Sequence, residues 1–322
     1  MYTYLHESFY TNMRNIIDSQ PLSSILIALS GGQDSLCLVR LLQDFIKEYK
    51  CRLNISYIHI DHQWKKDSQK QVEHLINLLK IKNEKIYIYQ IQHIVKSELE
   101  ARNIRYQILI QHAANYKYTT IITGHTSTDK IETFLQQLMR GTTIDGATSL
   151  THKRQLNKDT QIIRPLINYT RSDLAWFCRK FTLPVWSDIS NYEYNINRNR
   201  LRNELLPYLN QYFLFNVEQQ INYFLHISDI ENEYIKQNAI KLYMISRHET
   251  NLALNYLLIN KQHHALQART LQIFIYHNFS QSLSQSFLNK IIYTIQKTSI
   301  KHYIIEWKNL RLKKYDNWLY IY

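Results

Sequence analysis

Glycine, proline and cysteine are all scarce in this chain of 322 residues. It has five glycines and four prolines, and neither residue type occurs after Pro207. Because turn-forming residues concentrate in the first two thirds, we expect one domain over residues 1–210 and a second region over residues 211–322. The three cysteines are far apart and form no C-x-x-C pair. Their spacing argues against a zinc ribbon or a disulfide framework and indicates a reducing compartment.

Long apolar runs and targeting segments are missing as well. No stretch of about 18 apolar residues is present, so we expect no membrane span and no membrane partner. The opening stretch MYTYLHESFYTNMRNIIDSQP contains acids and resembles neither a signal peptide nor a transit peptide. The many Ile and Asn residues and the 25 Tyr are typical of an AT-rich genome. We therefore expect a protein of the plastid (chloroplast) stroma, encoded in the plastid without a transit peptide, with the bacterial cytoplasm as the alternative.

Acidic residues are outnumbered, with 26 Asp and Glu against 39 Lys and Arg, which gives a net charge of +13. This excess favours a polyanionic partner such as nucleic acid, although a biased composition alone could also produce it. Basic residues are dense between residues 152 and 202, where the segment NRNRLRNE combines Arg198, Arg200 and Arg202 with amide side chains. The pattern suits an RNA phosphate backbone, and a solvated basic helix is the alternative.

Apolar strand patterns alternate with helical periodicity in the first part of the chain. The predicted strands are residues 24–29, 54–60, 85–91 and 118–124. The predicted helices are residues 35–49, 69–80, 97–116 and 129–140. The alternation predicts an α/β fold, a parallel sheet with helices on both faces. The pattern from about residue 208 to 300 is helical, and the aromatic tail predicts two or three short strands.

Three polar stretches follow predicted strands: SGGQDS at 30–35, HIDH at 59–62 and TGHTSTD at 123–129. Ligands of parallel sheets bind beyond the carboxyl ends of the strands, so we expect these stretches to form one site. SGGQDS is neither a Walker loop nor a G-x-G-x-x-G fingerprint. It offers hydroxyls, glycine amides and the Asp34 carboxylate, a set that suits a pyrophosphate bridged to the carboxylate by Mg²⁺. A tight turn with Asp34 or Ser35 capping the helix is the alternative.

Six ordered motifs carry a resemblance to a known family. S-G-G-x-D-S after the first strand resembles the signature of the PP-loop ATP pyrophosphatases, whose fold is adenine-nucleotide alpha-hydrolase-like. Within that superfamily, the later motifs are similar to those of the tRNA(Ile)-lysidine synthases. These motifs are IHIDH (58–62), ARNIRYQIL (101–109), TGHTSTDKIETFLQQLMRGT (123–142), IIRPLI (162–167) and WSDISNYEYNINRNRLRNELLP (186–207).

The resemblance implies a reaction on a tRNA(Ile) with a CAU anticodon. ATP adenylates the C2 carbonyl oxygen of the wobble cytidine, and the amine of free L-lysine then displaces AMP. The modified tRNA reads AUA and is charged with Ile. The implied cofactors are ATP and Mg²⁺, and the implied partners are this tRNA and free lysine.

The resemblance also assigns roles to residues of this sequence. ATP binding falls to Ser30, Gly31, Gly32, Gln33, Asp34 and Ser35, with Asp34 and Ser35 catalytic and Asp34 next to the metal. Lysine binding falls to Asp129 and Glu132. Contact with a phosphate or with the adenylate falls to Arg102 and Arg105, and tRNA binding to Arg198, Arg200 and Arg202.

Other interpretations of these residues stay open. Asp129 and Glu132 are three apart and share a helix face, but this spacing is also that of a capping box. In the second-strand motif, His62 is followed by Gln63, Trp64 and Lys65, where the family tends to have Gly, Leu and Arg.

The rival functions are another PP-loop tRNA-modifying enzyme of the thiolase type, or a non-catalytic tRNA-binding protein of the same fold. Cys37 and Cys178 lie in predicted helices, which suits buried apolar thiols better than catalytic cysteines. The sequence leaves a homodimer open.

Overall fold

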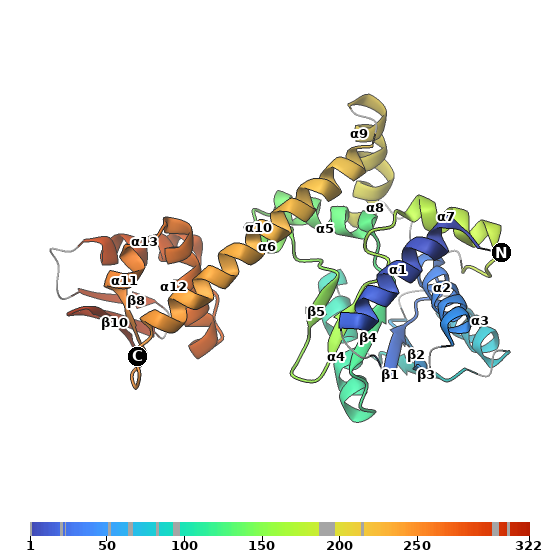
Figure 1. The fold of residues 1–322 in the computed structure, drawn as a ribbon, viewed down its shortest axis with the longest axis horizontal. Helices are drawn as coiled ribbons and strands as arrows, with labels where there is room; N and C mark the ends of the chain where they lie inside the picture. Colours follow the sequence, from blue (N-terminus) through green and yellow to red (C-terminus); the bar gives the residue numbers. More distant parts are fainter. Residues whose placement is uncertain are drawn as a thin grey trace. The chain divides into compact units, whose positions relative to one another are not determined.

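The computed structural model describes residues 2–19, 22, 24–50, 53–63, 67–81, 84–92, 97–186, 197–213, 216–297, 303–307 and 310–322. These residues form two compact units, Met1–Leu225 and His226–Tyr322 (Figure 1). The division lies within helix α10 (Val217–Ser246), whereas the sequence predicted a boundary between residues 210 and 211. Because α10 contains neither Gly nor Pro, turn residues do not mark the division.

The first unit is built on a six-stranded sheet with the order β3-β2-β1-β4-β6-β5. The strands are β1 (Ser24–Ala28), β2 (Asn54–Asp61), β3 (Ile86–Gln90), β4 (Thr120–Thr123), β5 (Lys153–Gln155) and β6 (Gln161–Ile163). Strands β1, β2, β3, β4 and β6 pair in parallel, which confirms the predicted fold class. Strand β5 pairs antiparallel with β6. Both strands span three residues, too short for an apolar period to reveal them.

Helices cover both faces of this sheet. On one face are α1 (Tyr4–Ser19), α2 (Gln33–Tyr49), α3 (Ser68–Lys80) and α7 (Arg171–Lys180), and on the other is α4 (Glu98–Asn115). Helices α5 (Ser127–Met139) and α6 (Ile144–Ala147) follow β4. Helix α8 (Asn197–Arg200), the π-helical turn η2 (Leu201–Leu205) and α9 (Leu206–Tyr212) follow one another without a break. The turn η2 was not predicted, because its five residues are too few for their spacing to be told from that of an α-helix.

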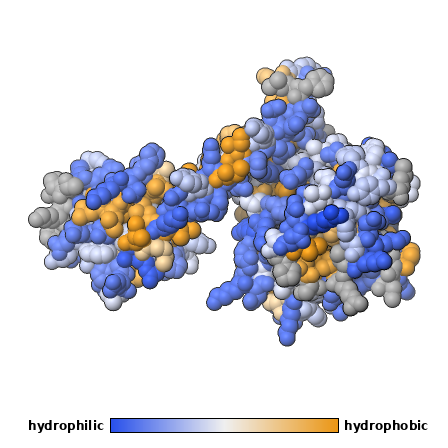
Figure 2. All heavy atoms as spheres, in the orientation of Figure 1, coloured by the Kyte–Doolittle hydropathy of each residue, from blue (hydrophilic) through white to orange (hydrophobic). Residues whose placement is uncertain are grey.

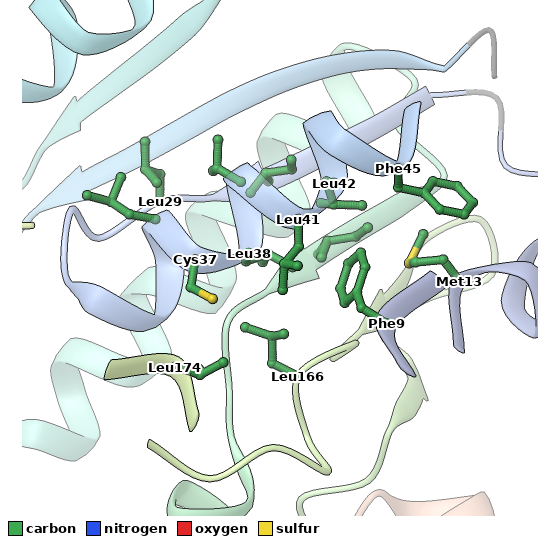
Figure 3. Packing of buried hydrophobic residues seen from close by; sticks show 14 of the residues in the cluster. Phe9, Met13, Leu29, Cys37, Leu38, Leu41, Leu42, Phe45, Leu166 and Leu174 are labelled. Atoms are coloured by element: carbon green, nitrogen blue, oxygen red, sulfur yellow. The ribbon is translucent and has the colours of Figure 1, made fainter. Parts of the chain in front are cut away.

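The strand period places alternate β1 residues in different cores. Ile25 and Ile27 pack with Phe9 of α1 and Phe45 of α2, in the cluster shown in Figure 3. Leu26 faces the other way and packs with Leu109 of α4. Burial on both faces explains why β1 is a continuous apolar run, and it fixes the strand whose carboxyl end leads into SGGQDS.

The second unit combines helices with an antiparallel sheet of order β7-β10-β9-β8. Its elements after α10 are β7 (Ala253–Asn255), α11 (Tyr256–Asn260), α12 (His264–Phe279), α13 (Gln285–Gln296), β8 (Tyr303–Trp307), β9 (Leu310–Tyr315) and β10 (Trp318–Ile321). The predicted terminal strands are confirmed, while β7 lies in a stretch expected to be helical. Across the residues that the structure describes, no helix is both long and apolar enough to cross a membrane.

Candidate active site

The SGGQDS turn joins β1 to α2 in a conformation that requires glycine. Gly31 has a φ of +77°, and a Cβ at this position would lie 3.3 Å from a methyl carbon of Leu75. Hydrogen bonds from its own hydroxyls hold the turn in place. Ser30 donates to Ser35 Oγ at 3.1 Å, and Ser35 donates to the Gly32 carbonyl at 2.9 Å. Hydroxyls and the first amides of α2 are thus held at one helix N-terminus, an arrangement that suits an anion.

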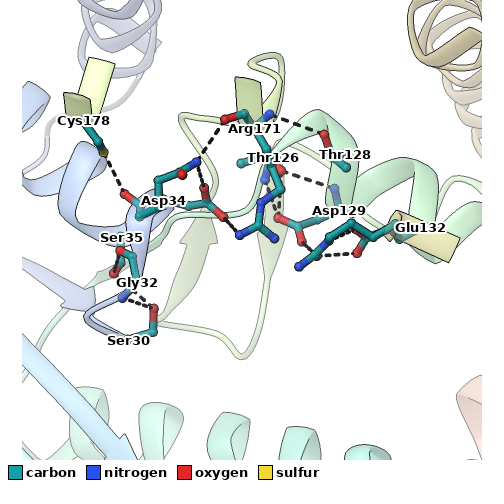
Figure 4. A network of polar contacts seen from close by, with 12 residues as sticks. Ser30, Gly32, Asp34, Ser35, Thr126, Thr128, Asp129, Glu132, Arg171 and Cys178 are labelled. Carbon is teal, nitrogen blue, oxygen red and sulfur yellow. Dashed lines mark hydrogen bonds and ion pairs between the residues drawn. The ribbon is translucent and has the colours of Figure 1, made fainter. Parts of the chain in front are cut away.

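Asp34 is fixed by contacts on its own turn and on α7. Its Oδ2 lies 3.3 Å from Nη2 of Arg171, and its Oδ1 accepts a hydrogen bond from Gln33 Nε2 at 3.3 Å (Figure 4). Burial raises the pKa of Asp34 to about 6, against the opposing effect of Arg171. A carboxyl whose pKa is raised by burial beside a helix N-terminus is typical of a functional site.

The loop after β4 touches the SGGQDS turn directly. A Cβ on Gly124 would lie 3.2 Å from the backbone carbonyl of Asp34, so any side chain here would require the Asp34 backbone to shift. The end of β2 contacts the residue that precedes the SGGQDS turn, because Nδ1 of His59 lies 2.8 Å from the Leu29 carbonyl oxygen. The structure therefore brings the three polar stretches to one edge of the sheet.

Asp129 serves α5 as a capping residue and also forms an ion pair. Its Oδ2 accepts from the Thr126 amide at 2.9 Å, and its own amide donates to Thr126 Oγ1, which completes a capping box. Its other oxygen, Oδ1, lies 2.7 Å from Nη2 of Arg198. Burial alone would raise the pKa of Asp129, but Arg198 together with its other neighbours lowers it to about 2. Thus Oδ2 of Asp129 caps the N-terminus of α5, and Oδ1 faces the guanidinium groups of Arg198 and Arg202.

Glu132 is completely buried between two arginines. Arg198 Nε lies 2.5 Å from Oε2, and Arg202 Nε lies 2.5 Å from Oε1. Arg202 adds Nη2 at 2.8 Å from Oε2, a two-pronged contact that lysine could not make. We call Asp129, Glu132, Arg198 and Arg202 the acid–arginine cluster. It contains two carboxylates and two guanidinium groups beside the SGGQDS turn.

The other residues predicted to belong to the site are Arg200, Arg102 and Arg105. Arg200 is exposed and pairs with Glu204 at 3.1 Å. The guanidinium of Arg102 lies 5.7 Å from the ring centre of Tyr106. Desolvation lowers the pKa of the half-buried His125 to about 3, and Arg102 adds a smaller effect in the same direction. Arg105 is exposed on α4.

Two parts of the predicted motifs lie outside the described residues, namely positions 187–196 of the last motif and Lys65, which follows the second-strand motif. Sequence reasoning missed Arg171, because it contacts Asp34 across 137 positions of chain that no local spacing connects. The local signal at this position is the capping box of Thr170 and Asp173, which marks a helix start and no ligand.

Asp34 fits a magnesium ion that is held mainly by phosphates. No group of three or more His, Cys, Asp or Glu residues that could hold a metal occurs in the described part of the chain. Mg²⁺ in nucleotide sites is bound by one or two carboxylates together with substrate phosphates and water. The Asp34 carboxylate, on the same turn as the Ser30 and Ser35 hydroxyls, is suited to this arrangement.

Comparison with known proteins gives relatives over the whole chain. A model described as a PP-loop domain matches residues 5–209. A chloroplastic tRNA(Ile)-lysidine synthase from Gracilaria tenuistipitata var. liui is 50% identical over 99% of both chains. The protein of that name from Pyropia yezoensis is 37% identical over 99% of this chain and 96% of its own. A tRNA(Ile)-lysidine synthase of a Nostoc species is 38% identical over 75% of this chain and 70% of its own.

One solved structure is similar to this chain in fold. The U34-tRNA thiolase from Methanococcus maripaludis with its 4Fe-4S cluster matches with a TM-score of 0.57 at 14% identity. The match covers 68% of this chain and 77% of the thiolase. At this identity the likeness concerns the fold alone.

Proposed function

Because this chain belongs to the tRNA(Ile)-lysidine synthases of the PP-loop superfamily, we propose that it joins free L-lysine to the wobble cytidine of a CAU-anticodon tRNA(Ile). The C2 carbonyl oxygen attacks the α-phosphorus of ATP, and the bond to pyrophosphate breaks. The lysine amine then attacks C2, the C2–O bond breaks, AMP leaves and the nitrogen loses a proton. The products are lysidine, AMP and pyrophosphate.

The SGGQDS turn is the proposed site for the ATP phosphates. Its amides, with the Ser30 and Ser35 hydroxyls, would donate to the pyrophosphate, and Asp34 would hold the Mg²⁺ that balances its charge. The metal supplies charge neutralisation as pyrophosphate departs. Arg171 is already placed beside Asp34 at 3.3 Å, so it is a further candidate for a phosphate contact.

The acid–arginine cluster is the proposed site for lysine, and its geometry is the observation that carries the proposal. Free lysine has both a carboxylate and ammonium groups, so a pocket for it needs charges of both signs. Asp129 and Glu132 supply the acids, and Arg198 and Arg202 supply cations 2.5–2.8 Å from them. In this arrangement the ammonium would replace a guanidinium at a carboxylate, and the released arginine would pair with the lysine carboxylate or with an RNA phosphate. Because Arg198 and Arg202 are engaged by the acids, they would contact tRNA through other N–H donors of their guanidinium groups or after release from the acids.

Release of pyrophosphate, together with the group that is added to the RNA, tests the proposal and separates it from its rivals. We expect release to require ATP, Mg²⁺ and tRNA, with modification of the RNA requiring lysine as well. A thiolase would incorporate sulfur in place of lysine, and a binding protein would release no pyrophosphate. The described cysteines, Cys37 and Cys178, are both buried, which suits neither a cluster nor an attacking thiolate.

The relatives named chloroplastic favour the plastid as the location, with a bacterial type of cytoplasm as the alternative. A homodimer stays a prediction, and light scattering on the purified protein tests it.

A further inference from the structure

A groove separates α5 from the continuous helix formed by α8, η2 and α9. Its volume is about 580 Å³, within the range typical of ligand pockets. It is lined by Gln136 and Met139 of α5, by Arg140 at the C-cap of α5, and by Arg200, Glu204 and Tyr208 of the facing helix, with leucines between them. These residues recur every three or four positions on each helix, so the groove lies where two helix faces diverge.

The lining of the groove combines apolar surface, one aromatic ring and an excess of arginine. Met139 is 65% exposed and Tyr208 is 53% exposed, so both offer apolar surface to a ligand. The lining has two basic residues, Arg140 and Arg200, and one acidic residue, Glu204. An exposed tyrosine beside arginines is the combination that binds unpaired nucleobases, by stacking on the ring and by pairing of the phosphates with guanidinium groups.

The groove is connected to the acid–arginine cluster through the two helices that form it. Helix α5 carries Glu132 in the cluster, and the groove residues of α5 follow four to eight positions later, about 6–12 Å along the helix axis. On the other helix, Arg198 and Arg202 face the acids while Arg200 and Tyr208 line the groove. The π-turn η2 carries Arg202 of the cluster and Glu204 of the groove lining, and such turns are frequent at functional sites.

We propose that this groove binds an unpaired base of the anticodon loop next to the wobble cytidine, stacked on Tyr208. The inference rests on the proposed function, because it places the reacting cytidine next to the acid–arginine cluster, where lysine is proposed to bind. With the cytidine drawn out to the reaction site, its neighbour loses a stacking partner. Tyr208 replaces that partner, and Arg140 and Arg200 hold the adjoining phosphates. The groove would thereby select the loop bases that flank the cytidine.

The test measures binding of a fluorescein-labelled anticodon stem-loop RNA with a CAU loop to the full-length protein. Loss of one base–aromatic stack costs about 1–3 kcal/mol, so Tyr208→Ala should weaken binding at least about fivefold. Tyr208→Phe keeps the ring and should stay within about twofold of wild type. Tyr116→Ala is the matched control, because Tyr116 is also 53% exposed but precedes β4, at the opposite edge of the sheet.

A second pair of variants guards against loss of folding in Tyr208→Ala. Met139→Asp places a carboxylate in the groove, whereas Leu138→Asp places one on the neighbouring residue, which is 56% exposed and outside the groove lining. We expect Met139→Asp to weaken RNA binding and Leu138→Asp to leave it within about twofold. A stem-loop with 2-aminopurine at the anticodon adenine should be quenched by wild type and less quenched by Tyr208→Ala.

Lysidine formation by the same wild-type preparation separates the two proposals. If wild type forms lysidine while Tyr208→Ala and Met139→Asp bind the RNA as wild type does, the groove proposal is wrong and the proposed function stands. Such a result would also be expected if the groove served a protein partner. If wild type binds the stem-loop through Tyr208 but forms no lysidine, the reaction assigned to the chain is wrong.

Discussion

Substitution of Glu132 by glutamine is the sharpest test of the acid–arginine cluster. The side chain of Glu132 is completely buried, whereas those of Arg198 and Arg202 are 23% and 17% exposed. Removing one member of a buried ion pair costs about 3–5 kcal/mol, because the remaining charge is left unbalanced. Water still reaches the two arginines, and Asp129 still balances part of their charge. We therefore expect the free energy of unfolding to fall by about 2–3 kcal/mol, less than for a fully buried pair. For a unit of this size that corresponds to a fall in Tm of about 4–12 °C.

The matched control is Glu204→Gln, which breaks the exposed pair with Arg200 at 3.1 Å. Exposed pairs contribute about 0–1 kcal/mol, so its Tm should change by no more than about 4 °C. Calorimetry measures both variants, and steady-state pyrophosphate release measures KM for lysine and for ATP. Glu132→Gln should raise KM for lysine more than KM for ATP. A loss of stability with an unchanged KM for lysine would refute the lysine site and leave Glu132 a purely structural residue.

Four other outcomes are expected. Asp34→Asn should abolish pyrophosphate release and leave tRNA affinity within about twofold, as filter binding would show; a parallel loss of affinity would contradict a role confined to ATP. The pKa of Asp34 is raised to about 6, so folding disfavours its ionised form. The stability that the protonated carboxyl contributes is lost as pH rises from about 4 to 6. If the ionised carboxylate takes part in the reaction, pyrophosphate release should fall as pH drops through about 6. A flat pH profile across that window would argue against a working carboxylate. Gly124→Ala places a methyl group 3.2 Å from the Asp34 backbone and should raise KM for ATP. Unchanged kinetics would show that the SGGQDS turn can shift to accept the methyl group without loss of ATP binding. Arg200→Ala should weaken tRNA binding and reduce its salt slope by about one, and an unaltered slope would mean that Arg200 meets no phosphate.

The sequence predicts the first sheet well because its strands carry strong local patterns. β1 and β2 are apolar on both faces, and each is followed by helical periodicity, so the parallel core follows from residues 24–60 alone. Strands β5 and β6 have three residues each and depend on neighbours for their pairing. The division within α10 is also invisible locally, because no break in the helix marks it.

The site is predicted in its parts but not in its pairings. The positions of Asp34, Asp129 and Glu132 follow from motifs that end strands or begin helices. Their cationic partners lie much further along the chain: Arg198 meets Glu132 from 66 positions away. Long-range ion pairs leave no periodic signal, so the sequence assigned Arg198 to RNA without revealing that it also neutralises buried acids. Asp129 shows that two interpretations of one motif can hold together, since it is both capping residue and ion-pair partner.

The most direct test of the proposed function incubates the purified protein with ATP, Mg²⁺, free lysine and a tRNA(Ile) transcript with a CAU anticodon. The RNA is digested to nucleosides, which are analysed by mass spectrometry. We expect a cytidine heavier by one lysine residue, absent when lysine or ATP is omitted. Unmodified cytidine in every reaction, with the transcript shown to be bound, would contradict the assignment of this chain as a lysidine-forming enzyme.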